Sequence, residues 1–215
     1  MLSSPALKVR SDSFNDGDFI PTRYALGKTS ADGKIDLAEN RNPHLEWSDV
    51  PGGTKSIAIL CIDVDAPTKP DDVNKEGRVV PADLPRADFA HWVLVDLAPN
   101  RSIKEGAFSD GVTAHGKEGP AGAEGTRQGI NDYTGWFAGD PDMKGDYYGY
   151  DGPCPPFNDS IVHRYRFTVY ALDIAAAPVE GKFTSQDVLS AIEGHVLAEA
   201  SIVCKYKINE AAREL

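Results

Sequence analysis

The sequence has few cysteines and no long hydrophobic run, and both absences narrow the class of protein. Its 3 cysteines, Cys61, Cys154 and Cys204, lie far apart and form no Cys-x-x-Cys pair, so we expect neither a zinc cluster nor a disulfide framework. The longest apolar run, residues 57–62, is far too short to span a bilayer. The N-terminus, MLSSPALKVR, lacks the apolar core of a secretory signal. We therefore expect a cytoplasmic protein without integral membrane contact.

Positive charge is scarce as well. The chain has 22 Lys and Arg against 33 Asp and Glu, which gives a formal net charge of −11. Nucleic acids and anionic membranes favour clustered basic residues, so we expect neither as a main partner. The sequence also contains no HExxH, GxSxG or P-loop pattern. An anionic ligand would therefore need a local positive site.

The remaining composition is that of a globular protein. The chain has 215 residues, of which 41% are hydrophobic and 26% are charged, and this length suits one domain better than two. The 20 glycines and 15 prolines indicate many turns without reaching the range of disordered proteins.

Apolar patterns predict several strands. Residues 55–64 are apolar on both alternating faces, which is typical of a strand in the middle of a sheet. In the run 89–98, simple alternation places His91 on the same face as Val93 and Val95. Strands are predicted at 7–10, 55–64, 89–98, 162–172 and 201–208.

Two further segments do not show the alternating pattern of a strand. Thr184 and Asp187 form a capping pair that predicts a helix, and an apolar stripe continues it as far as Glu199. His195 lies in this stripe, so we expect it to pack in the core. Residues 99–149 show no strong regular element but hold many aromatic side chains, and a stretch of this length predicts a lid or a dimer contact.

Polar side chains lie where three of the strands begin or end. Asp63 and Asp65 end the strand 55–64, His91 begins the next, and His163 follows a loop stiffened by glycine and proline. The carboxylates are equally compatible with a strand that emerges into solvent, and His91 taken alone with a histidine of the core. The repeated arrangement favours a shared site.

Several motifs resemble the phosphatidylethanolamine-binding proteins. They are DVDAP at 63–67, AHWVLVDL at 90–97, and GPCPP at 152–156 followed by HRYRFTVYALD. RQGINDYTGW at 127–136 and EGHVLAEA at 193–200 resemble the bacterial branch that is often labelled Raf-kinase-inhibitor-like. The resemblance implies a single mainly β domain over residues 1–215, in which a large antiparallel sheet packs on a smaller sheet with a few peripheral helices.

The resemblance also implies a pocket for a small anion or a phosphoryl head group, and a homodimer as in many bacterial relatives. One departure is the long link FNDSIV at 157–162, and if it folds over the mouth the pocket favours small anions over lipid head groups. The pocket positions that carry over are Asp63, Asp65, His91, Gly152, Pro153, His163 and Tyr165.

A physical account of this pocket predicts how it binds. Asp63 and Asp65 can hold His91 and His163 as cations, which would donate hydrogen bonds to an anion. Binding would then weaken as the pH rises through about 6 to 8. We therefore expect a binding protein without catalytic residues, metal or cofactor, which regulates a partner protein.

Two alternatives stay open at this point. A hydrolase or another enzyme could use the same His and Asp residues for acid–base or metal chemistry. Some relatives imply a third function, the inhibition of a protease or kinase by surface contact, although no motif in this sequence encodes it.

Overall fold

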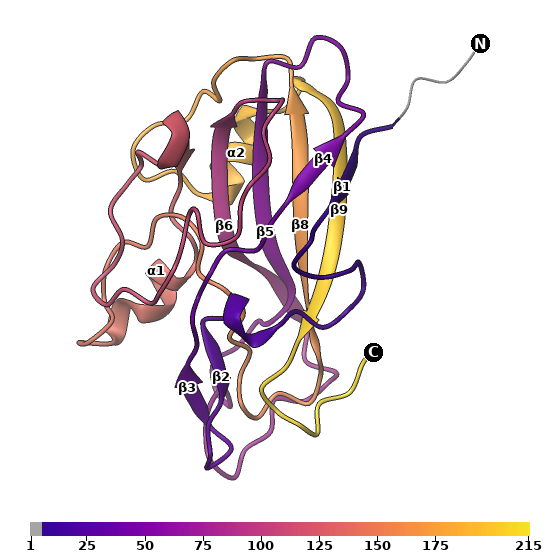
Figure 1. Cartoon of the computed structure of the whole chain (residues 1–215). Helices are drawn as coiled ribbons and strands as arrows, with labels where there is room; N and C mark the ends of the chain where they lie inside the picture. The colour runs from indigo at the N-terminus through magenta and orange to yellow at the C-terminus, as the bar shows by residue number, and fades with distance from the viewer. Residues whose placement is uncertain (1–5) are drawn as a thin grey trace.

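The computed structural model describes residues 6–215, and its largest feature is a five-stranded antiparallel sheet (Figure 1). The first five residues, part of the N-terminus in which no secretory signal is expected, lie outside the described residues. No helix within 6–215 has the length and hydropathy needed to cross a membrane. In spatial order the strands are β7 (Arg127–Gln128), β6 (Arg86–Leu97), β5 (Ser56–Pro67), β8 (His163–Leu172) and β9 (Val196–Tyr206).

Two small sheets and short helices surround the large sheet. The small sheets pair β1 (Lys8–Arg10) with β4 (Glu46–Ser48) and β2 (Gly27–Thr29) with β3 (Ile35–Leu37). This architecture confirms the predicted fold class. The helices are α1 (Tyr133–Trp136), α2 (Ser185–Ala191) and the 3₁₀ turns η1 (Thr22–Tyr24), η2 (Ala123–Gly125) and η3 (Phe137–Gly139).

The large sheet is buried on both faces, which explains the continuous apolar run of β5. On one face Ile59 and Trp92 pack with Trp47 of β4. On the other face Leu60 packs with Val188 of α2. Figure 1 shows α2 and the β1–β4 pair on opposite sides of the sheet. The prediction of a central strand is therefore confirmed.

The predicted helix begins where expected but ends early. Thr184 and Asp187 form the capping box, and α2 ends at Ala191. Gly194 then adopts a φ of +80°, and the residues that follow pair with β8 as part of β9. The expectation that His195 packs in the core is wrong, because its side chain is 43% exposed and its Nδ1 atom lies 2.8 Å from Asp173.

A β-bulge reorients His91. Cys61 pairs with Trp92 and Ile62 pairs with Ala90, so His91 is the extra residue in β6. Such a bulge redirects side chains. The predicted alternation is therefore wrong here, because the His91 ring packs 5.1 Å from the ring of Tyr165, on the sheet face away from α2.

Candidate functional site

A cavity of about 760 Å³ opens beside the ends of β5, β6 and β8. This volume is in the range of small-molecule sites in proteins. The residues that line it and carry polar groups of interest are Asp63, His91, Tyr133, His163 and Tyr165. The structure thus brings the polar residues from three predicted strand ends to one cavity.

The other predicted pocket residues support the cavity without lining it. Asp65 accepts hydrogen bonds from Arg164 at 2.8 and 2.9 Å. Gly152 packs so closely that a Cβ atom there would lie 2.0 Å from the carbonyl oxygen of Tyr24. The carbonyl oxygen of Pro153 accepts hydrogen bonds from the backbone amides of Gly27, the first residue of β2, and of Leu26 just before it. These three residues hold the backbone around the site.

His163 is enclosed by two carboxylates. Its Nδ1 atom lies 2.7 Å from Oδ2 of Asp63, and its Nε2 atom lies 2.9 Å from Oδ2 of Asp159. Burial alone would lower the pKa of His163, but the two carboxylates outweigh burial and raise it to about 9. His163 is therefore a cation at neutral pH, as predicted, yet both of its ring nitrogens are already hydrogen-bonded.

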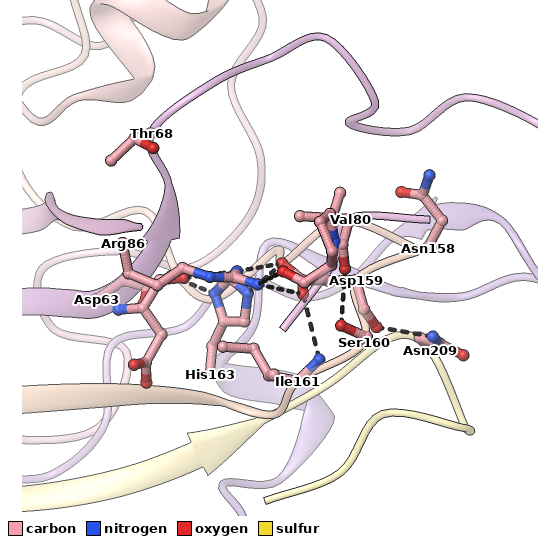
Figure 2. A network of polar contacts seen from close by, with 12 residues as sticks. Asp63, Thr68, Val80, Arg86, Asn158, Asp159, Ser160, Ile161, His163 and Asn209 are labelled. Carbon is pink, nitrogen blue, oxygen red and sulfur yellow. Dashed lines mark hydrogen bonds and ion pairs between the residues drawn. The ribbon is translucent and has the colours of Figure 1, made fainter. Parts of the chain in front are cut away.

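Asp159 also binds a second cation. Its two oxygens accept hydrogen bonds from Arg86 at 2.6 and 3.0 Å (Figure 2). Burial would raise the pKa of Asp159, but the hydrogen bonds from His163 and Arg86 lower it below its ordinary value. Charges therefore alternate in the order Asp63, His163, Asp159, Arg86, and the four groups together are neutral.

His91 differs from His163 in both charge and hydrogen bonding. Its Nδ1 atom lies 2.8 Å from the carbonyl oxygen of Asp151, which can only accept, so Nδ1 carries the proton. Burial lowers the pKa of His91 in spite of the nearby Asp63. The predicted cation at His91 is therefore wrong for the free protein. Within residues 6–215, its Nε2 atom has no hydrogen-bond partner.

Asp151 keeps this carbonyl in place. Its buried carboxylate accepts hydrogen bonds from Asn40 at 2.8 Å and Asn131 at 2.7 Å, and it pairs with Lys117 at 3.0 Å. A buried carboxylate is stable only with such donors. The orientation and tautomer of His91 thus depend on a rigid polar cluster behind the cavity.

The hydroxyl of Tyr165 is an unpaired polar group in the cavity wall. The side chain is fully buried, and among the described residues its oxygen finds no hydrogen-bond partner. Burial raises its pKa well above the ordinary value, so the phenol keeps its proton. A buried hydroxyl without a partner is costly, and a ligand oxygen would satisfy it.

Aromatic side chains form the apolar wall. The Tyr133 ring packs 5.1 Å from Phe89, 5.3 Å from His91 and 5.3 Å from Phe137. Trp136 also lines the cavity and is 48% exposed. The aromatic stretch in which a lid or dimer contact is predicted thus supplies one wall of the cavity. Its movement as a lid and its role as a dimer contact stay predictions.

The segment 157–162 does not close the mouth. Among these residues none lines the cavity, although Pro155 and Pro156 before them do. Asn158 instead donates to the carbonyls of three residues in the loop 68–85, which connects β5 and β6. The predicted narrowing of the pocket by this segment is therefore not found.

Two residues of the site escaped the sequence argument. Asp159 lies in the segment 157–162 and Arg86 begins β6. Asp159 stands four residues before His163, but this spacing has no fixed meaning outside a helix. Only the folded chain brings Arg86 to it.

The site offers little for metal binding or thiol chemistry. Within residues 6–215, no group of three or more His, Cys, Asp or Glu is arranged to hold a metal ion. Cys154 lines the cavity, but burial raises its pKa to about 12. Its thiol is therefore protonated at neutral pH and is a poor nucleophile.

Comparisons with known proteins agree on one family. The family model described as phosphatidylethanolamine-binding protein matches residues 10–207. A UPF0098 protein of Methanothermobacter thermautotrophicus is 34% identical over 94% of this chain and 99% of its own length. The UPF0098 protein YbhB of Escherichia coli is 32% identical over 93% of this chain and 99% of its own length.

Solved structures show the same fold. The phosphatidylethanolamine-binding protein homologue CT736 of Chlamydia trachomatis matches with a TM-score of 0.61 and 26% identity, over 94% of this chain and 97% of that one. Escherichia coli YbcL matches with a TM-score of 0.65 and 24% identity, over 94% of this chain and 99% of that one, and supports the fold alone.

Proposed function

The chain belongs to the phosphatidylethanolamine-binding protein family, and from this premise we propose that it binds a small phosphate ester or a phospholipid head group without catalysis. The ligand's phosphoryl oxygens lie against the Nε2 atom of His91 and the hydroxyl of Tyr165. Its carbon substituent packs on the aromatic wall around Tyr133. The loaded protein then acts on a partner protein.

The observation that carries this proposal is the buried Tyr165 hydroxyl. It has no partner among the described residues and lines the same cavity as His91. A phosphoryl oxygen accepts hydrogen bonds strongly. It would therefore accept a hydrogen bond from the Tyr165 hydroxyl. The negative charge of the phosphoryl group would also favour a proton on Nε2 of His91. Both groups gain a partner from one ligand, which an apolar compound would not provide.

The arrangement favours binding over catalysis for two reasons. Both ring nitrogens of His163 are held by carboxylates, so His163 is poorly placed to transfer protons to a substrate. The thiol of Cys154 is protonated because burial raises its pKa to about 12. An enzyme that used this polar cluster would need an activated nucleophile or water molecule, and these residues activate neither.

The proposal is tested by calorimetric titration with glycerophosphoethanolamine. We expect the wild type to bind, Tyr165→Phe to bind roughly tenfold to a hundredfold more weakly because one hydrogen bond to a charged group is lost, and His91→Ala not to bind. Tyr170→Phe, on the α2 side of the sheet, is the matched control and should bind as the wild type does. Equal binding by Tyr165→Phe would contradict the proposal, and His91-dependent hydrolysis of 4-nitrophenyl phosphate would favour an enzyme.

A further inference from the structure

We infer that Asp159 is a specificity-determining residue, whose carboxylate fills an oxyanion site beside the pocket and thereby makes the pocket favour singly charged phosphodiesters over doubly charged phosphomonoesters. This inference rests on the proposed function, because it concerns which phosphate ester the same pocket accepts. Asp159 itself does not line the cavity. It acts through His163, which does.

The donors around Asp159 have the geometry of an anion site. Arg86 donates two hydrogen bonds, at 2.6 and 3.0 Å, one to each carboxylate oxygen. His163 donates a third at 2.9 Å and the amide of Ile161 a fourth at 3.2 Å. Bidentate arginine together with an imidazolium and an amide is a donor set suited to carboxylates and phosphates. Here a residue of the chain itself occupies that position.

The backbone of the segment 157–162 holds this carboxylate in place. The carbonyl of Asp159 accepts a hydrogen bond from Asn209 at 2.7 Å, and Ser160 pairs with Val80 through its amide and its hydroxyl (Figure 2). The side chain of Asp159 is only 1% exposed. A ligand would therefore have to break several contacts to displace it, and the internal carboxylate stays bound.

Asp159 changes the charge that a ligand meets. Without it, and with His163 still protonated beside Asp63, the cluster of Asp63, His163 and Arg86 would carry one net positive charge next to the cavity. With it, the cluster is neutral, and the cation gained on binding is the protonated His91. One cation matches a phosphodiester with a single negative charge. A phosphomonoester carries about 1.5 to 2 negative charges at pH 7. Besides the two histidines, the cation that lines the cavity within residues 6–215 is Lys69, which is exposed, so the second charge has no buried partner.

The test compares dimethyl phosphate with methyl phosphate at pH 7 by calorimetry on the wild type and on Asp159→Asn, which keeps the shape of the side chain and removes its charge. We expect the affinity ratio to shift toward methyl phosphate by about tenfold in Asp159→Asn. Asp96→Asn is the matched control, because Asp96 is ion-paired with Arg127 and does not line the cavity. It should keep the affinity ratio of the wild type. An unchanged ratio in Asp159→Asn would overturn the inference.

A second measurement tests the oxyanion site without any phosphate ester. Removing the carboxylate in Asp159→Ala leaves a space that formate fits. We expect sodium formate to raise the thermal midpoint of Asp159→Ala by at least about 2 °C over sodium chloride at equal ionic strength, and not to do so for the wild type. No formate effect would count against the site. If neither phosphate ester binds the wild type, the proposed function fails and the specificity role of Asp159 fails with it, and the formate result then decides only whether Asp159 fills an oxyanion site.

Discussion

The Nε2 atom of His163 lies 2.9 Å from the carboxylate of Asp159. This contact gives His163 a different role from His91, the other histidine that lines the cavity. His163 is a structural cation with both nitrogens hydrogen-bonded, whereas Nε2 of His91, which lines the cavity, has no hydrogen-bond partner among residues 6–215. His163, which is positively charged in the free protein, is therefore not the histidine that we expect to contact the ligand. That histidine is His91.

The stability of the protein should fall as the pH rises from about 6.5 to 9. The pKa of His163 is raised from its ordinary 6.5 to about 9 in the folded state, so the fold binds this proton more tightly than the unfolded chain. The contribution is fully present below pH 6.5 and is lost as the pH passes 9. Its size is on the order of 3 kcal/mol. Urea unfolding at pH 6, 7.5 and 9.5 measures it.

His163→Gln provides the control for this pH dependence. The variant lacks the titrating group, so the difference in unfolding free energy between wild type and variant should shrink across the same pH range. A wild type whose stability is constant or increases between pH 6.5 and 9.5 would contradict the assignment of the charge to His163.

Removal of the Asp159 carboxylate should destabilise the fold strongly. Asp159→Ala leaves the largely buried side chain of Arg86 without a carboxylate and His163 with only Asp63, and breaking a buried pair in this way costs about 3–5 kcal/mol. Adding Arg86→Met should restore part of this loss, because one uncompensated charge disappears. Chemical denaturation of the single and double variants measures the coupling. Asp72→Ala, which breaks an exposed ion pair with Arg78, should change stability by less than about 1 kcal/mol.

Gly152→Ala should disturb the site through its backbone. The added Cβ atom would lie 2.0 Å from the carbonyl oxygen of Tyr24, so the backbone that follows Asp151 must shift. We expect a loss of about 1–3 kcal/mol in unfolding free energy together with weaker binding of glycerophosphoethanolamine. Gly52→Ala, where nothing lies within 4 Å of the new atom, is the control. Equal free energies of unfolding for the two variants would show that the close packing at Gly152 does not affect stability.

Ligand affinity should increase as the pH falls from 8 through 6.5. Burial lowers the pKa of His91 in the free protein, and a bound phosphoryl group would raise it, so binding takes up a proton. The increase should therefore continue to lower pH than the range of 6 to 8 that two cationic histidines would give. Titrations with glycerophosphoethanolamine between pH 5 and 8 check this slope. Constant affinity over the range would exclude proton uptake at His91.

Much of the fold could be predicted because its strands have strong local patterns. The run that became β5 is apolar on both faces, and both faces of the sheet are covered. The end of α2 was less predictable. The apolar stripe after Ala191 fits a helix, but Gly194 and pairing with β8 turn it into strand β9. Tertiary pairing decides such cases.

The polar core of the site was predictable only in part. Asp63, His91 and His163 line one cavity, as expected from the ends of their strands, and Tyr165, which only the family resemblance implied, lines it too. The protonation of His91 was not predictable, because it depends on a bulge and on the carbonyl of Asp151. Neither feature has a local signature in the sequence.

The most direct test is the ¹⁵N NMR spectrum of the histidine side chains during a titration with glycerophosphoethanolamine at pH 6.5, with signals assigned from His91→Gln and His163→Gln. We predict that Nε2 of His91 changes from an unprotonated to a protonated nitrogen as ligand is added. Both nitrogens of His163 should stay protonated and keep their shifts. A change at His163 with none at His91 would contradict the account.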